Sequence, residues 1–188
     1  MYDRMPRELT LPTGEVLRPF DMSDLDQLVE IVNDNLDHLR PWMPWAQEPV
    51  AAESQTEFLT GSARNWADGS DFVWGIRAGD EILGGIGLHT RRGPGVLEIG
   101  YWLRASEQGR GLVTTAARVL AEVAASYDEV DQVAIYCDEA NVRSAAVPRR
   151  LGFTLAGVAE QEPLAASETG RHQIWTMPAA AIRAGWTH

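Results

Sequence analysis

The sequence contains one cysteine, Cys137, and no lysine. A single cysteine excludes an internal disulfide, and it leaves no cluster of cysteine and histidine of the kind that holds structural zinc. The absence of lysine excludes the phosphate-binding P-loop, which requires Gly-Lys followed by Ser or Thr. We therefore expect no metal ion and no P-loop nucleotide site.

Long apolar runs and excess basic charge are also missing. No run approaches the roughly 20 apolar residues that span a membrane, and residues 1–6 lack the basic and apolar regions of a signal peptide. The formal net charge is -11, which repels nucleic acid and attracts a cationic substrate such as a protonated amine, although acidity also serves solubility alone. We expect a soluble, cytoplasmic protein that binds neither membranes nor nucleic acids.

The length and composition suit one globular domain. The chain has 188 residues, of which 45% are hydrophobic and 23% charged, enough for a sizeable core. It has no internal repeat and no long low-complexity tract. We predict a single domain over residues 1–188 with a core of about 9–178.

Hydrophobic periodicity predicts a mixed α/β (α+β) order. An antiparallel meander comes first, and a strand-helix-strand-helix unit follows it. Asp21 or Ser23 is expected to cap the first helix. Further helices are expected at 52–67, 112–127 and 142–151. The expected strands are 9–11, 16–19, 72–77, 82–89, 96–103, 130–137, 154–160 and 171–177.

The loop Gln108-Gly109-Arg110-Gly111 lies between an expected strand and an expected helix. A helix N-terminus exposes unpaired N–H groups and partial positive charge, and glycines let the backbone approach an anion closely. Two glycines can also serve only as a turn. A dinucleotide-binding loop would need a third glycine where this chain has Thr114. The loop is therefore a candidate phosphate site that matches neither the P-loop nor the dinucleotide-binding loop.

Three separated parts of the chain resemble the GCN5-related N-acetyltransferase (GNAT) superfamily, and within it the RimJ/RimL branch of ribosomal-protein N-terminal acetyltransferases. They are Leu39-Arg40-Pro41-Trp42-Met43-Pro44-Trp45, then Glu98-Ile99-Gly100-Tyr101-Trp102-Leu103 with Gly109-Arg110-Gly111, and last Asn141-Val142-Arg143-Ser144 with Leu151-Gly152-Phe153. The resemblance implies a mixed, mostly antiparallel central sheet with flanking helices. This sheet splays apart at the family's strands four and five, which here are expected at 96–103 and 130–137, and coenzyme A lies in the gap.

The resemblance also implies where acetyl-CoA binds. The backbone near Trp102, Leu103 and Arg104 is expected to pair with the pantetheine arm of the cofactor. Asn141 and Ser144 are expected to face that arm from the other side. Amides of the loop and of the helix start are expected to bind the pyrophosphate: Gln108, Gly109, Arg110, Gly111, Leu112 and Val113.

Acetyl transfer to an amine requires a neutral amine, a polarised thioester carbonyl and a proton for the departing thiolate. By resemblance Ser144 lies near the sulfur and is a candidate general acid, although a serine early in a helix often bonds only local backbone. By resemblance the base is either Glu98, whose pKa burial would raise toward neutrality, or a glutamate before the last strand, where Glu160 and Glu162 are the local choices and Glu162 is favoured. His172 is a third candidate and is also expected to contact substrate.

Cys137 and two tryptophans complete the candidates. Cys137 would form an acyl-enzyme only with an activating partner, so we predict direct attack by the amine in a ternary complex. Trp42 and Trp45 lie in a proline-broken segment. By resemblance they are expected to cover the acceptor, although they equally suit a role in pinning a loop.

The predicted activity is therefore transfer of an acetyl group from acetyl-CoA to a primary amine, with a protein N-terminus as the favoured acceptor. Alternatives are a larger acyl donor or a small acceptor such as an antibiotic or an aminoacyl nucleotide. A non-catalytic sensor or interaction module is a third possibility. A homodimer is compatible with the sequence.

Overall fold

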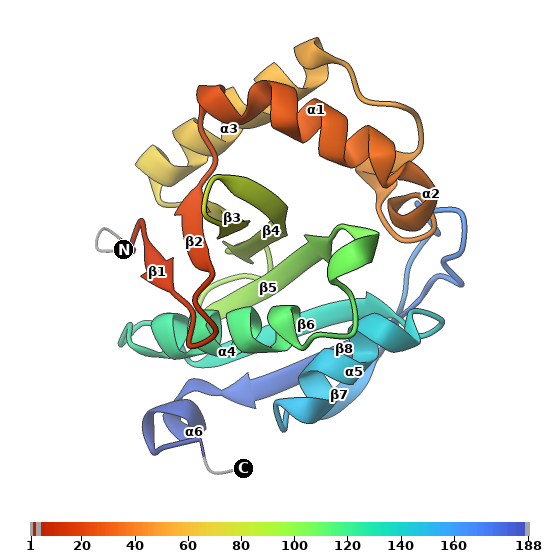
Figure 1. Ribbon diagram of the computed structural model, residues 1–188. Coiled ribbons are helices and arrows are strands. Elements are labelled where there is room, and N and C mark those ends of the chain that lie inside the picture. Colours follow the sequence, from red (N-terminus) through yellow and green to blue (C-terminus); the bar gives the residue numbers. More distant parts are fainter. Residues whose placement is uncertain (1, 3–4, 187–188) are drawn as a thin grey trace.

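Eight strands form one sheet in the order β1-β2-β3-β4-β5-β6-β8-β7 (Figure 1). The computed structural model describes residue 2 and residues 5–186, so residues 1, 3, 4, 187 and 188 of the predicted domain lie outside the description. The pair β5–β6 is parallel and every other neighbouring pair is antiparallel. The strands are β1 (Leu9–Thr10), β2 (Val16–Pro19), β3 (Asp71–Ala78), β4 (Glu81–His89), β5 (Val96–Leu103), β6 (Gln132–Asp138), β7 (Thr154–Glu160) and β8 (Arg171–Pro178).

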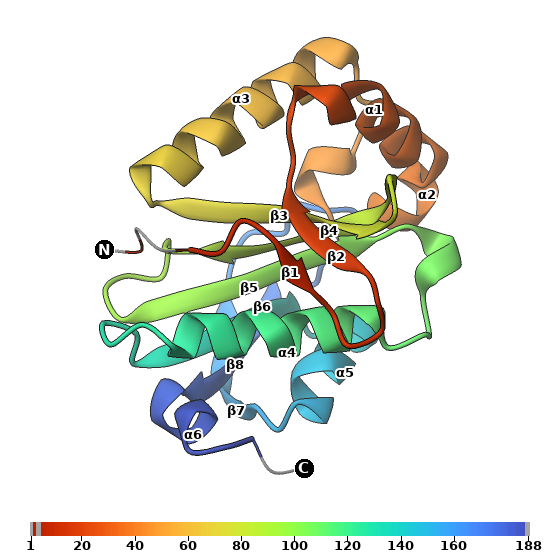
Figure 2. The same ribbon diagram turned by 60° about the vertical axis from the view of Figure 1, so that its left-hand side comes forward.

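Helices cover both faces of this sheet. The α-helices are α1 (Leu25–Asp34), α2 (Leu36–Leu39), α3 (Ala52–Asp68), α4 (Leu112–Ala125), α5 (Val142–Arg150) and α6 (Ala179–Arg183). Figure 2 shows α1 and α3 on one face, and α4 and α5 on the other. The mixed, mostly antiparallel fold predicted from the sequence is confirmed.

The first helical segment, the 3-10 helix Met22–Asp24, is held by side chains at its start. Asp21 accepts a hydrogen bond from the Ser23 backbone N–H at 2.8 Å, and the Asp24 carboxylate accepts one from the Asp21 N–H at 2.9 Å. Of the two predicted caps, Asp21 therefore caps this short 3-10 helix, which leads into α1. The N-cap residue of α1 itself is Asp24, which forms no side-chain capping bond to that helix. Asp24 also forms a buried ion pair of 2.5 Å with Arg77 of β3. This pair fastens the start of α1 to the sheet.

Two boundaries differ by two residues from those predicted, and two short helices were not predicted. The helix expected to run to residue 127 ends at Ala125, because the chain turns there and Val130 N–H bonds to Tyr127 C=O. Val130 is buried but precedes β6, which starts at Gln132. The short helices α2 and α6 were not predicted, since segments of four and five residues carry little periodicity.

Strands β5 and β6 pair over a short stretch and then separate. Val96, Leu97 and Glu98 have partners on β6, whereas β5 pairs with β4 as far as Leu103. β6 itself pairs with β8 along its whole length, from Gln132 to Asp138. The second half of β5 therefore presents a backbone edge to the gap. This is the splayed sheet expected from the resemblance.

The close approach of β4 and β5 beside this gap gives a first prediction. A Cβ on Gly84 would meet the Trp102 carbonyl oxygen and lie 2.9 Å from Leu103 Cα. We expect Gly84→Ala to lower the free energy of unfolding by about 1–3 kcal/mol, because backbone atoms cannot yield locally. Gly61→Ala is the matched control. It has open space within α3 and should gain about 0.5–1 kcal/mol in urea unfolding. Equal effects of the two changes would contradict the close approach.

Candidate active site

The loop before α4 has the geometry of an anion-binding turn. Gly109 and Gly111 have φ of 76° and 78°, in the left-handed region that favours glycine. Gly111 is the N-cap of α4 and provides no side-chain hydrogen bond to the first turn. A Cβ added at either glycine meets nothing within 4 Å. The loop therefore leaves room beside its glycines, and the first N–H groups of α4 have no acceptor within the helix, as a phosphate site requires.

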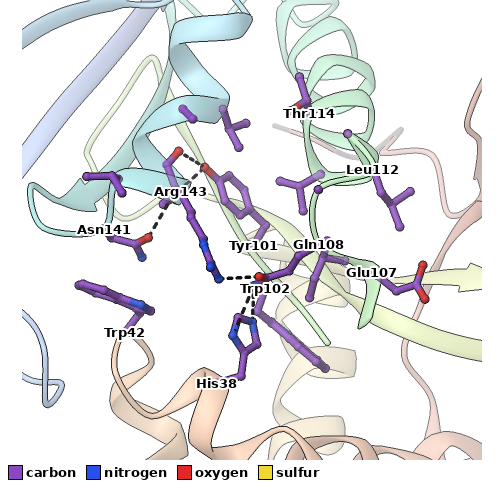
Figure 3. A pocket seen from close by; sticks show the side chains of 18 of the residues that line it. His38, Trp42, Tyr101, Trp102, Glu107, Gln108, Leu112, Thr114, Asn141 and Arg143 are labelled. Atoms are coloured by element: carbon purple, nitrogen blue, oxygen red, sulfur yellow. Dashed lines mark hydrogen bonds between the residues drawn. The ribbon is translucent and has the colours of Figure 1, made fainter. Parts of the chain in front are cut away.

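A cavity of about 540 Å³ lies between this loop and α5, and we call it the loop cavity. Figure 3 shows its walls, formed by the end of β5, the loop, the first turn of α4 and one face of α5. Most of the residues predicted to bind cofactor line it: Trp102, Leu103, Gln108, Gly109, Gly111, Leu112, Val113, Asn141 and Ser144.

Two predicted cofactor residues, Arg104 and Arg110, do not line this cavity. Both guanidinium groups bind Glu107, at 3.0 Å from Arg104 and 2.5 Å from Arg110, and Arg104 also pairs with Glu81. Their positive charges are therefore matched locally. Their expected contacts with cofactor through the backbone remain a prediction.

A chain of side chains joins α2, the loop and α5. Arg143 Nη1 donates to Gln108 Oε1 at 2.6 Å, and Gln108 Nε2 lies 2.7 Å from His38 Nε2 (Figure 3). Because arginine can only donate, the amide must donate to His38 through Nε2. Burial and the Arg143 charge lower the pKa of His38, which favours the neutral ring that accepts this bond. No sequence pattern indicated His38, whereas Arg143 belongs to the segment Asn141-Val142-Arg143-Ser144 that carries the resemblance.

The start of α5 is fixed by Asn141 and Tyr101. The Asn141 side chain accepts a hydrogen bond from Ser144 N–H at 3.1 Å. The Tyr101 hydroxyl lies 3.1 Å from both the carbonyl oxygen and the Oγ of Ser144. Burial raises the pKa of Tyr101, so its hydroxyl stays protonated. Ser144 thus lies in the cavity wall with its hydroxyl bonded to β5.

A second cavity, of about 700 Å³, shares the wall formed by Tyr101, Asn141 and Ser144 with the loop cavity. We call it the tryptophan cavity. Trp42 and Trp45 line it, and Trp45 is 47% exposed. It also contains Glu98 and His172, which had been predicted, together with Cys137. The residues that line both cavities are Trp42, Met43, Tyr101, Trp102, Asn141 and Ser144.

Glu162 is exposed and lines neither cavity, whereas Glu168 lines the tryptophan cavity. Glu168 Oε2 accepts from Leu164 N–H at 2.7 Å and Ala165 N–H at 3.0 Å. Its Oε1 lies 3.9 Å from His172 Nε2. Sequence spacing missed Glu168 because the loop between β7 and β8 has no periodicity. Its course depends on distant contacts.

Asp138 provides those contacts. Its carboxylate accepts hydrogen bonds from the backbone N–H groups of Thr169 at 2.8 Å and Gly170 at 3.0 Å. Burial alone would raise the pKa of Asp138, but these bonds and one from Ala140 N–H lower it. A buried carboxylate at the end of β6 therefore holds the loop that carries Glu168.

The expectation that burial raises the pKa of Glu98 is wrong. Glu98 is 2% exposed, and burial alone would raise its pKa, but hydrogen bonds from Arg91 and Arg92 outweigh this effect and lower it. Arg91 binds both carboxylate oxygens, at 2.6 and 3.0 Å, and Arg92 binds Oε2. Arg92 also stacks over the Tyr136 ring of β6 at 3.7 Å. Glu98 is consequently a charged carboxylate with its oxygens occupied.

Burial raises the pKa of the Cys137 thiol to about 11, so the thiolate needed for nucleophilic attack is scarce near neutral pH.

Among residues 2 and 5–186, no three His, Cys, Asp or Glu side chains are grouped to hold a metal ion. In the same residues no helix has the length and apolarity to cross a membrane.

Residues 16–154 match a family described as Acetyltransferase (GNAT) domain. The chain belongs to this family. The protein is therefore a GNAT acetyltransferase. Structures with this fold have been solved in complex with coenzyme A and with acetyl-CoA, the donor expected from the sequence.

Its GNAT relatives include characterised and solved proteins. YdaF of Bacillus subtilis (strain 168), named provisionally as a ribosomal N-acetyltransferase, is 31% identical over 76% of this chain and 79% of its own. A ribosomal-protein-serine acetyltransferase of Escherichia coli (strain K12) is 29% identical over 71% of this chain and 75% of its own. The fold matches RimL, a ribosomal L7/L12 alpha-N-protein acetyltransferase in complex with coenzyme A, with a TM-score of 0.82 and 24% identity. This match covers 91% of this chain and 97% of that one.

The Glu98 cluster gives a pH-dependent prediction. Glu98→Gln should lower the free energy of unfolding near neutral pH by about 2–4 kcal/mol, because an amide leaves two guanidinium groups without their anion. The wild-type carboxylate keeps its contribution above its ordinary pKa of 4.5. That contribution disappears as the pH falls from there toward the lowered pKa of the folded state. The gap between the two proteins in urea unfolding should thus narrow in acid. A gap of constant size would contradict the ion cluster.

Proposed function

We propose that this GNAT enzyme transfers an acetyl group from acetyl-CoA to a protein N-terminal amine of the kind that its ribosomal-protein relatives modify. The observation that carries the proposal is the meeting of two cavities at one wall, which contains Tyr101, Asn141 and Ser144. One cavity has the features of a donor site and the other those of an acceptor site. Ribosomal proteins are met in the cytoplasm, so we propose that the enzyme acts there.

The loop cavity suits acetyl-CoA, which supplies the thioester whose acetyl group is transferred. The uncapped start of α4 and the open space at Gly109 and Gly111 suit its pyrophosphate. The free backbone edge of β5 from Ile99 to Leu103 suits the amide-bearing arm. Arg143 adds a cation that has no carboxylate partner among the described residues, and we propose that it contacts phosphate.

We propose Glu168 as the base, in place of Glu98 and Glu162. Backbone N–H groups hold one Glu168 oxygen, and the other oxygen, near His172, is left to accept a proton from the acceptor ammonium. His172 is 16% exposed in its side chain and restrains that oxygen from one side. A carboxylate also attracts the protonated amine before it loses its proton.

Ser144 is the proposed acid because its hydroxyl lies in the wall common to both cavities. It holds a proton where the leaving thiolate needs one. The high pKa of Cys137 argues for direct attack by the amine and against an acyl-enzyme. Trp42 and Trp45 provide flat apolar surfaces for the first residues of a peptide. The tests can instead reveal a donor with a larger acyl group, a small amine as acceptor, or a non-catalytic role. The homodimer remains a prediction.

Turnover of an N-terminal amine is the direct test. We expect thiol release from acetyl-CoA with peptides that begin with Ser or Ala. Glu168→Gln should lower kcat by about 10²-fold, because an amide cannot accept the proton. Glu162→Gln is the matched comparison and should turn over like wild type. A loss in Glu162→Gln alone would return the role of base to Glu162, and no turnover with any amine would reject the proposed function.

The phosphate contact of Arg143 is tested by binding. Arg143→Ala should weaken coenzyme A binding by about tenfold in calorimetry, because a charge-assisted bond is lost. Binding of pantetheine, which lacks phosphate, should change little. Arg149→Ala is the control, since Arg149 lies on the same helix and stacks on Trp175 away from the loop cavity. An equal loss for both ligands would show that Arg143 acts on the shape of the cavity and contacts no phosphate.

A further inference from the structure

Helix α5 contains a proline, Pro148, near its middle. In an α-helix the N–H of each residue donates to the carbonyl four residues earlier, so residue 148 would donate to Ser144. Proline has no N–H. The carbonyl of Ser144 therefore lacks its helical donor, and this is the residue that we propose as the general acid.

Tyr101 provides the missing donor from β5. Its hydroxyl lies 3.1 Å from the Ser144 carbonyl oxygen and 3.1 Å from Ser144 Oγ. A tyrosine hydroxyl carries a single hydrogen, and a carbonyl oxygen can only accept. The hydrogen of Tyr101 is consequently used by the carbonyl. In the second contact Ser144 Oγ must then donate, with the Tyr101 oxygen as acceptor.

We propose that Tyr101 is a positioning residue that directs the Ser144 hydroxyl and is not itself a proton donor in acetyl transfer, because Pro148 commits the Tyr101 hydrogen to the backbone. The inference rests on the proposed function of Ser144. The Ser144 hydrogen, by contrast, is donated only to a hydroxyl oxygen, that of Tyr101, and it can turn from there toward a leaving group. The burial that raises the pKa of Tyr101 also keeps its hydrogen in place.

The position of this contact explains why it matters. β5 and β6 have no strand pairing beyond Glu98, so the wall between the two cavities lacks a backbone ladder there. Tyr101 joins β5 to the first turn of α5 across that gap. Loss of its hydroxyl would release both the carbonyl and the side chain of Ser144.

Stability measurements separate the carbonyl from the side chain. Tyr101→Phe should raise the unfolding equilibrium constant about tenfold, because the Ser144 carbonyl loses its donor. In a Pro148→Ala background, the Ala N–H can donate to that carbonyl, so the same change should cost less than about twofold. Pro148→Leu repeats the cycle if the alanine variant folds poorly. An equal cost of Tyr101→Phe in the wild-type and proline-free backgrounds would overturn the role of Pro148.

Turnover measurements test the positioning. Tyr101→Phe should lower kcat about tenfold and leave KM for acetyl-CoA within about twofold, because Ser144 is misdirected while the cofactor contacts remain. Pro148→Ala should restore stability to Tyr101→Phe without restoring kcat. In a Ser144→Ala background, Tyr101→Phe should cause no further loss. An unchanged kcat in Tyr101→Phe, or additive losses with Ser144→Ala, would overturn the proposal.

Different results would reject the proposed acetyltransferase function and the positioning role of Tyr101. If wild type acetylates no amine, the proposed function falls, and the stability cycle still tests whether Pro148 leaves the Ser144 carbonyl to Tyr101. If wild type turns over and Tyr101→Phe turns over equally well, only the positioning role is lost.

Discussion

Strands β5 and β6 lie in parallel for three residue pairs and then diverge, and both cavities depend on that divergence. Glu98 is the last paired residue of β5, opposite Ala134. Its carboxylate binds Arg91 and Arg92, and Arg92 stacks on Tyr136 of β6. The point of separation is therefore fastened by a buried carboxylate, two guanidinium groups and an aromatic ring. Glu98, a candidate catalytic base by its sequence, thus contributes to the contacts that join β5 and β6 at this point.

Beyond that point, side chains replace the backbone ladder. Tyr101 bonds to Ser144, and Gln108 bonds to Arg143, so β5 and its loop are joined to α5 at two places. Side-chain contacts of this kind can open for a ligand at a lower cost than a strand pair, because each involves one or two hydrogen bonds. The cleft can thus be both defined in shape and accessible to a long cofactor.

The sequence predicted the parts of this arrangement that local rules determine. The glycine-containing loop before a helix and the alternation of helix and strand both follow from short-range chemistry. The family resemblance supplied the splayed sheet, which no local pattern specifies. Boundaries were wrong mainly where a turn interrupted a hydrophobic pattern, as at Ala125.

The missed features depend on contacts between distant residues. Glu168 lines a cavity because Asp138, about 30 residues earlier, holds its loop through backbone N–H groups. The pKa of Glu98 is lowered because a hairpin returns Arg91 and Arg92 to it. Arg91 and Glu98 are seven residues apart across a turn that the sequence predicted. The contact between these two residues could therefore have been predicted from the sequence. The loop of Glu168 offered no such signal.

The three carboxylates of the tryptophan cavity differ in how their oxygens are used, and this difference supports one of them as the base. Both carboxylate oxygens of Glu98 accept hydrogen bonds from arginine side chains. Both oxygens of Asp138 accept hydrogen bonds from backbone N–H groups or from the Thr169 hydroxyl. Each of these two carboxylates has a lowered pKa, so neither accepts a proton readily at neutral pH. Glu168 keeps one oxygen, Oε1, that lies 3.9 Å from His172 Nε2 and accepts none of the backbone hydrogen bonds that hold Oε2. This difference supports our proposal that Glu168 Oε1 takes the proton of the acceptor ammonium.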